Sequence, residues 1–90
     1  MSNKSKGNLA NARRLSDKCR NLQRMLQRIA DQKFGEHKPF VGLPLPTERG
    51  FACIVSIGHV GSHFEWLTRE TDVVASRLEM ALDNCLEFIR

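Results

Sequence analysis

The chain has 90 residues, of which 41% are hydrophobic and 27% charged, which is typical of one globular domain and excludes wholesale disorder. Its net charge of +4 is divided at Pro39: residues 1–38 carry a balance of +7 and residues 39–90 one of −3, so the first part favours polyanions or an acidic partner. No apolar run approaches the roughly 18 residues of a membrane span, and the start MSNKSKGN lacks the apolar core of a signal peptide, so we expect a cytoplasmic protein without membrane contact.

Residues 8–34 carry the clearest helical pattern. We expect this helix to begin near Asn8, with Asn8 or Asn11 as its cap, and to end before Gly35. Residues 1–7 are predicted to be a flexible polar tail before a single domain over residues 8–90. The apolar positions follow a seven-residue repeat and lie on one side of the helix: Ala12, Leu15, Cys19, Leu22, Leu26 and Ile29. The repeat serves either packing on the protein's own sheet, which we favour, or a homodimer seam.

A connector and a hairpin follow the first helix. Residues 35–50 contain three prolines and predict a connector, with a possible edge strand over 39–43, where proline is tolerated. Residues 51–68 are rich in β-branched and aromatic residues around two glycines. This pattern predicts an antiparallel hairpin with its turn at Val60-Gly61.

That turn sets a register in which His59 lies opposite Ser62 and Ile57 opposite Phe64. Because side chains alternate along a strand, each strand has a core-facing and an outward-facing set. We expect the core face to hold Phe51, Cys53, Val55, Ile57, Phe64 and Trp66. The outer face then holds Ala52, Ile54, Ser56, Glu65 and Leu67.

Residues 70–90 predict a second amphipathic helix, with Thr68 or Thr71 as its cap. Its core positions are Val74, Leu78, Ala81, Leu82, Cys85 and Ile89, and its outer face is acidic through Glu79, Asp83 and Glu87. The predicted fold is α+β: a two-layer αββα or αβββα domain whose two helices cover one face of a small antiparallel sheet.

The arginines of the first helix are the strongest candidate for a binding site. Arg20, Arg24 and Arg28 follow one another at single turns, about 6 Å apart, a spacing that suits carboxylates on a protein or phosphates in a groove. An arginine side that only solvates the helix is an equally simple interpretation. The predicted partner-binding residues are Arg13, Arg20, Arg24, Arg28, Ile54, Glu65 and Leu67. The nucleic-acid alternative uses Arg13, Arg14, Lys18, Arg20, Arg24 and Arg28.

Catalytic and metal-binding patterns are lacking. The chain has no nucleophile elbow, phosphate-binding glycine loop or metalloprotease helix, so we expect no enzyme and no cofactor. His59 and His63 lack an identifiable third ligand, so no metal is expected. Cys19, Cys53 and Cys85 all fall on apolar-periodic positions and are expected to be buried, reduced thiols.

In size and organisation the chain resembles the accessory and host-takeover proteins of bacteriophages, including small inhibitors of bacterial defence systems. The resemblance implies a small non-enzymatic protein-protein interaction module, of phage or mobile-element type, that inhibits a larger host complex by binding its surface. We expect that surface to be acidic. The resemblance also implies that the cytoplasm is that of a bacterium or an infected host cell. The alternative is nucleic-acid binding through the first helix.

Overall fold

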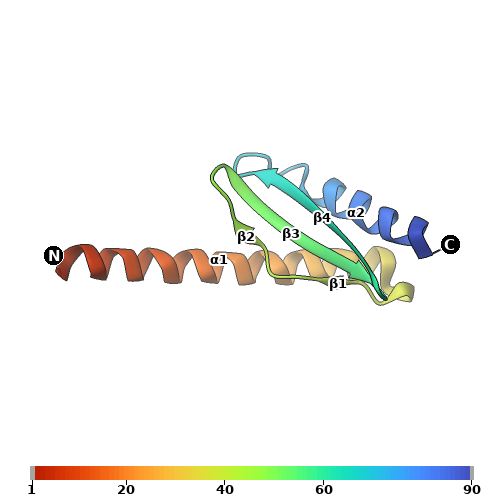
Figure 1. Cartoon of the computed structure of the whole chain (residues 1–90), viewed down its shortest axis with the longest axis horizontal. Coiled ribbons are helices and arrows are strands. Elements are labelled where there is room, and N and C mark those ends of the chain that lie inside the picture. The colour runs from red at the N-terminus through yellow and green to blue at the C-terminus, as the bar shows by residue number, and fades with distance from the viewer. Residues whose placement is uncertain (1, 90) are drawn as a thin grey trace.

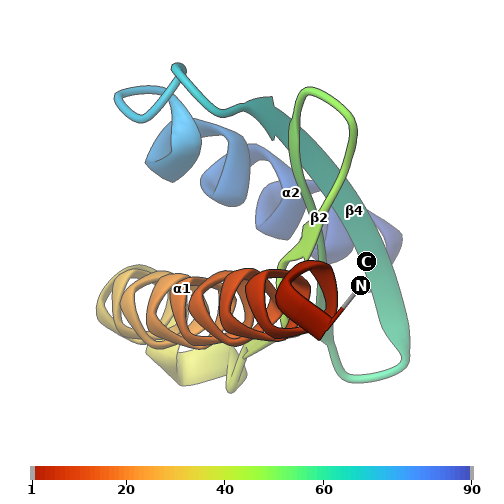
Figure 2. The same cartoon turned by 90° about the vertical axis from the view of Figure 1, so that its left-hand side faces the viewer.

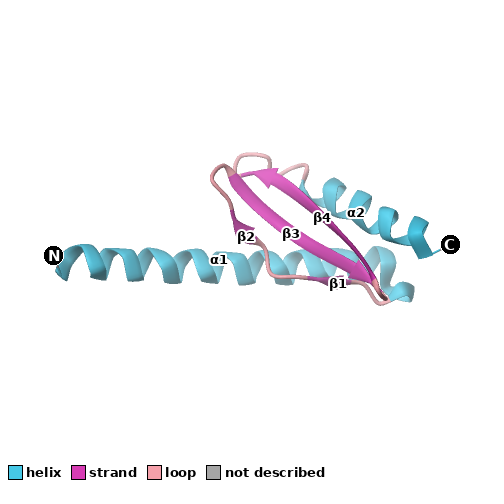
Figure 3. Cartoon of the chain, viewed as in Figure 1, coloured by secondary structure: helices cyan, strands magenta, loops and turns pink. Residues whose placement is uncertain are grey.

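The structure is a computed structural model that describes the backbone of residues 2–89 and the side chains of residues 12–89. The elements follow in the order α1 (Ser2–Phe34), a 3-10 turn (Gly35–His37), β1 (Phe40–Val41), β2 (Leu45–Pro46), β3 (Gly50–Ile57), β4 (Val60–Leu67) and α2 (Val74–Ile89). All strand pairs are antiparallel, with β3 between β4 and the pair β1 and β2 (Figures 1 and 3). The predicted α+β fold is confirmed.

The β3–β4 hairpin has a different register from the predicted one. Ile57 pairs with Val60 and Phe51 with Trp66, so the turn is Gly58-His59 and the predicted turn at Val60-Gly61 was wrong. Gly58 has a φ of 61°, the positive value that short hairpin turns require at their first central residue and that glycine adopts without strain. The register differs by four residues, an even number, so every side chain keeps its predicted face.

The core lies between the sheet and the two helices, which cover the same face of the sheet (Figure 2). The six predicted core residues of the hairpin are all buried. Trp66 stacks between Phe51 and Phe64, with ring centroids 5.4 and 5.5 Å apart, so these aromatic residues are core residues. All predicted core positions of α2 are buried except Ile89, which is exposed where the described helix ends.

The edge strand is longer than predicted and carries a bulge. Between the pairs Val41–Val55 and Leu45–Ala52 it has three residues, whereas β3 has two, which is the count of a β-bulge. Phe40 and Leu45 are five residues apart, so an unbroken strand would place them on opposite faces. The extra residue puts both of them on the outer face of the sheet.

Helix α1 begins at Ser2, so the predicted tail over 1–7 is helical from its second residue. Once a helix is nucleated, each added residue gains a backbone hydrogen bond, so the helix continues through residues of middling propensity. The side chains of Asn8 and Asn11, the predicted caps, lie outside the described part.

The N-terminal half of α1 projects beyond the rest of the domain (Figure 1). Residues 12–18 are exposed, and Cys19 is the first buried residue among those whose side chains are described. At about 1.5 Å per residue, residues 2–18 form an arm of about 25 Å. This arm explains the longest molecular dimension of 56 Å beside widths of 21 and 20 Å.

Helix α2 begins at Val74, four residues later than predicted, so neither Thr68 nor Thr71 lies at its N-terminal cap position. The Thr68 hydroxyl donates instead to the Arg49 carbonyl at 3.0 Å, which ties the end of β4 to the start of β3. The predicted cap serves as a clamp between strands because a turn over residues 71–73 intervenes before the helix.

Candidate interaction surfaces

Two glutamines of α1 bind the open edge of β1. The Gln27 side chain donates to the Pro39 carbonyl and accepts from the Val41 N–H, both at 2.9 Å. Gln23, one turn earlier, donates to the Val41 carbonyl at 3.1 Å. These bonds replace the ones that a neighbouring strand would make. Helix α1 therefore lies against the edge of the sheet, which brings its exposed side close to the outer sheet face.

A shallow groove of about 540 Å³ runs between α1 and β1. Its lining includes Arg24 and Arg28, two of the arginines predicted to bind a partner, and Phe40 from β1. Both arginines are exposed, and 59% of the Phe40 surface is exposed. Two arginines of the predicted site thus lie beside an aromatic side chain that the sequence interpretation did not include.

Large apolar side chains are exposed on the outer face of the sheet. Ile54, at 64% exposure, lies on the central strand, while Phe40 and Leu45, at 59% and 60%, come from the edge strand. Gly42 lies between Phe40 and Leu45 in the edge strand and close to the backbone of Ile54. Its N–H donates to the Ile54 carbonyl at 2.7 Å, and a Cβ on residue 42 would lie 3.0 Å from the same oxygen. We call Phe40, Leu45 and Ile54 the outer platform.

The other two predicted sheet residues lie on β4. Glu65 is exposed opposite Ala52 on the outer face, and Leu67 is half-buried opposite Gly50. Both line a groove that includes Arg49 and Arg77. They therefore lie across β3 from the edge strand that carries Phe40 and Leu45.

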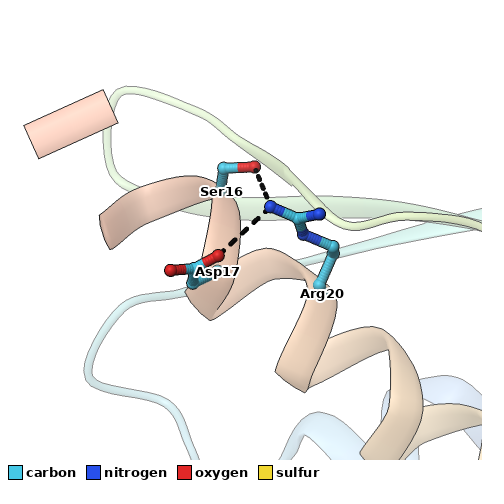
Figure 4. Close-up of polar contacts among 3 residues, drawn as sticks. All are labelled: Ser16, Asp17 and Arg20. Carbon is cyan, nitrogen blue, oxygen red and sulfur yellow. Dashed lines mark hydrogen bonds and ion pairs between the residues drawn. The ribbon is translucent and has the colours of Figure 1, made fainter. Parts of the chain in front are cut away.

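The basic residues of α1 do not form one surface. Arg20 donates to Asp17 at 3.1 Å and to the Ser16 hydroxyl at 3.4 Å (Figure 4). Arg14 and Lys18 line a different groove from Arg24 and Arg28, with Leu22 and Met25 among its other residues, while Arg13 is exposed on the arm. Lys18 also covers the Phe51 ring, with its Nζ 5.4 Å from the centroid. The six residues of the nucleic-acid alternative are thus spread around the helix.

The acidic side of α2 is divided as well. Glu79 is half-buried and forms an ion pair with Lys33 of α1, so the expectation that it points outward was wrong. This pair links the basic helix to the acidic helix within one chain. Asp83 and Glu87 are exposed, and Met80 and Phe88 on the same helix are 65% and 80% exposed.

The titratable groups offer no reactive centre among the described residues. Cys19, Cys53 and Cys85 are buried free thiols, as predicted. Burial raises the pKa of Cys53 to about 11 and also raises the pKa of Cys85, so these thiols stay neutral at physiological pH. Within residues 2–89 no three His, Cys, Asp or Glu side chains come together as metal ligands would; His59 lies in the hairpin turn and His63 is exposed on β4.

No protein-family model matches the chain, and no curated protein and no solved structure matches it either. Among the described residues, no helix combines the length and the apolar character needed to cross a membrane. Function therefore has to be inferred from the geometry of these surfaces.

Four residues important to that geometry were missed from the sequence. Phe40 was assigned to the possible edge strand and Leu45 to the connector after it, but neither was assigned to a binding surface, and their common face depends on the bulge. Gln23 and Gln27 look like ordinary solvent-facing helix residues. Their spacing of four residues, which places both side chains on one side of the helix, is the single sequence signal that could have identified them.

Proposed function

We propose that the chain is a small non-enzymatic protein-binding module that docks through the outer platform together with Arg24 and Arg28. The observation that carries the proposal is the position of three large, more than half-exposed apolar side chains on one sheet face, next to two exposed arginines. An aromatic and aliphatic centre with arginine at its side is the composition that binding hot spots favour.

The surface also indicates the chemistry of the partner. Arg24 and Arg28 form no ion pair within residues 12–89, so their guanidinium groups are available to carboxylates, which they can bind through two parallel hydrogen bonds. A matching partner presents an apolar patch bordered by Asp or Glu. That the partner is a larger host complex, inhibited by this contact, stays a prediction from the resemblance to phage accessory proteins.

The alternative, nucleic-acid binding, is less favoured by the arrangement of charges. Phosphate tracking needs cations along one side of the helix, but Arg14 and Lys18 lie in a separate groove and Arg20 is held by Asp17. Phe40 and Ile54 lie on a face whose neighbours on β4 include Glu65. An exposed carboxylate would repel a phosphate backbone and suits a protein partner better.

Loss of binding by platform variants would support the proposal. Immobilised protein would be incubated with nuclease-treated lysate of the natural host, and retained proteins identified by mass spectrometry. We expect one protein to be retained by the wild type and lost by both Phe40→Ser/Ile54→Ser and Arg24→Glu/Arg28→Glu. Matched controls are Ile89→Ser and Arg49→Glu/Arg69→Glu, which change exposed apolar and arginine residues elsewhere and should retain it. Equal retention by all variants would refute the proposal.

Fluorescence anisotropy with labelled duplex DNA and RNA tests the alternative. Four phosphate contacts would give a slope of log affinity against log salt of about −3.6 on duplex DNA. Binding with that slope, abolished by Arg24→Glu/Arg28→Glu, would replace the protein-binding proposal with the nucleic-acid one. No binding at low salt would eliminate the nucleic-acid alternative.

A further inference from the structure

Two helical surfaces remain outside the outer platform, and both combine charge with exposed apolar side chains. On α1, the basic strip consists of the exposed Leu15 and of Arg14, Lys18, Leu22 and Met25, which line one groove together with Asp17 and Asn21. On α2, the acidic strip consists of Met80, Asp83, Glu87 and Phe88. The two strips have opposite sign and similar apolar content.

The basic strip continues from the core-facing side of α1 onto the arm. Leu15 and Met25 are exposed and Leu22 is half-buried. Arg14 and Lys18 line one groove with Leu22 and Met25, and the acid of that groove, Asp17, is paired with Arg20. Further along the helix the core covers this side, but over residues 12–18 no part of the described chain does. The arm, which projects beyond the rest of the domain in Figure 1, therefore exposes Leu15 to solvent with Arg14 and Lys18 near it on the helix.

The acidic strip lies on one side of α2, because residues 80, 83 and 87 are separated by steps of three and four. Its carboxylates Asp83 and Glu87 form no ion pair among the described residues, and Phe88 beside them is the most exposed large apolar side chain of that part. Burial of Met80 and Phe88 in a contact would remove apolar surface from water and so stabilise that contact.

We propose that the basic strip of one copy packs on the acidic strip of a second copy of this chain. The two strips match in chemistry, because each has two charged side chains of one sign, opposite to those of the other strip, together with exposed apolar side chains. Each copy carries one strip of each kind, so the same contact can form twice around a two-fold axis and close the assembly at a dimer. The two strips of one chain cannot pack on each other. Helix α1 is continuous, and its ion pair with α2 is at Lys33, far from the arm.

A charge-swap test distinguishes a second copy of this chain from an unrelated partner. Arg14→Glu/Lys18→Glu makes the basic strip acidic, and Asp83→Lys/Glu87→Lys makes the acidic strip basic. Each variant alone should repel itself, because both strips then have the same sign. An equimolar mixture of the two should restore both contacts and form a heterodimer.

Sedimentation equilibrium over a protein concentration series, with the two variants differently labelled, measures these states. We expect the wild type to approach twice the monomer mass of 10.3 kDa, with weaker association at high salt. Each charge-swapped variant should raise the dimer dissociation constant at least about tenfold, and mixing should restore it. Arg14→Glu alone serves if the double variant fails to fold, because Lys18 also covers Phe51. Arg13→Glu is the matched control, since Arg13 is the exposed neighbour outside the strip.

Three results would overturn the proposal. The first is a wild type that stays monomeric over the whole concentration series. The second is a dimer that both charge-swapped variants retain, and the third is a mixture that fails to associate. All three leave the outer platform and its lysate test unaffected, because no residue is shared between the two surfaces.

Discussion

Replacing Gln27 with leucine should open the β1 edge of the sheet. Gln27 makes two hydrogen bonds of 2.9 Å at the strand edge: it donates to the Pro39 carbonyl and accepts from the Val41 N–H. Leucine has nearly the size of glutamine but can make neither bond. Val41 is fully buried and Pro39 is buried, so both backbone groups would lose their partners where water has poor access. The chain would then carry two unsatisfied backbone groups.

Leaving a buried polar group without a partner costs about 1–3 kcal/mol. Gln27 itself is half-buried, so some water reaches the site and the lower end of that range applies, about 1–1.5 kcal/mol per group, which gives a loss of about 2–3 kcal/mol for the two groups. With an m value of about 1.2 kcal/mol/M, the urea midpoint measured by circular dichroism should fall by about 2 M. That is a large part of the stability of a domain of this size.

Gln32→Leu is the matched control: it changes the same residue type on the same helix, at an exposed position that donates no hydrogen bond to β1 among those described. It should stay within about 0.5 kcal/mol of the wild type. Gln27→Glu adds a test of sign, since a carboxylate facing the Pro39 carbonyl and Asp31 favours its protonated form and so has a raised pKa. Its deficit should therefore be smaller in acid than at neutral pH. A Gln27→Leu midpoint equal to that of Gln32→Leu would refute the reasoning.

Three further outcomes follow from packing and charge. Gly50→Ala should destabilise the domain by about 3 kcal/mol in urea unfolding, because a Cβ would lie 1.9 Å from the Trp66 carbonyl oxygen and force the backbone apart; an unchanged midpoint would contradict this geometry. Burial raises the pKa of Cys53 from 9.0 to about 11, so the thiol ionises at lower pH in the unfolded chain than in the folded one. The free energy of unfolding should therefore fall as the pH rises through this interval, and it should fall less in Cys53→Ala. Identical pH profiles of the two proteins would argue against burial as the cause. Lys33→Glu should lower stability slightly and the added Glu79→Lys should recover it, with a coupling energy of about 0.2–1 kcal/mol in a double-mutant cycle; no coupling would mean that this partly exposed pair is not formed in solution.

The faces of the elements could be predicted from the sequence, but the pairing of the strands could not. Alternation in Phe51, Cys53 and Val55 fixes which side is buried, and this holds for any register that differs by an even number of residues. The choice between turns at Gly58 and Gly61 depends on which glycine takes the positive φ. The apolar pattern carries no information about that angle.

The candidate surfaces were less predictable because they depend on tertiary geometry. Arg24 and Arg28 were identified from their spacing, whereas Phe40 and Leu45 share a face only through a one-residue bulge between proline-rich pieces. Gln27 is a common helix surface residue, and its role exists only once β1 lies beside α1. Side chains that satisfy a neighbouring backbone leave no periodic signal in a sequence.

The β1 edge, which Gln23 and Gln27 bind, limits how further strands can join the sheet. In β4, Val60 pairs with Ile57 across the turn, so the N–H and C=O groups of alternate residues such as His63 and Glu65 point away from β3. No strand of the described chain pairs with β4 on that side. Edge-to-edge joining could use this single side, and two copies joined there would have no open strand left. A sheet with both sides open can instead add copies without end, as a fibre does. In this chain, Gln23 and Gln27 occupy the backbone groups of the β1 edge, so strand pairing between copies is directed to β4.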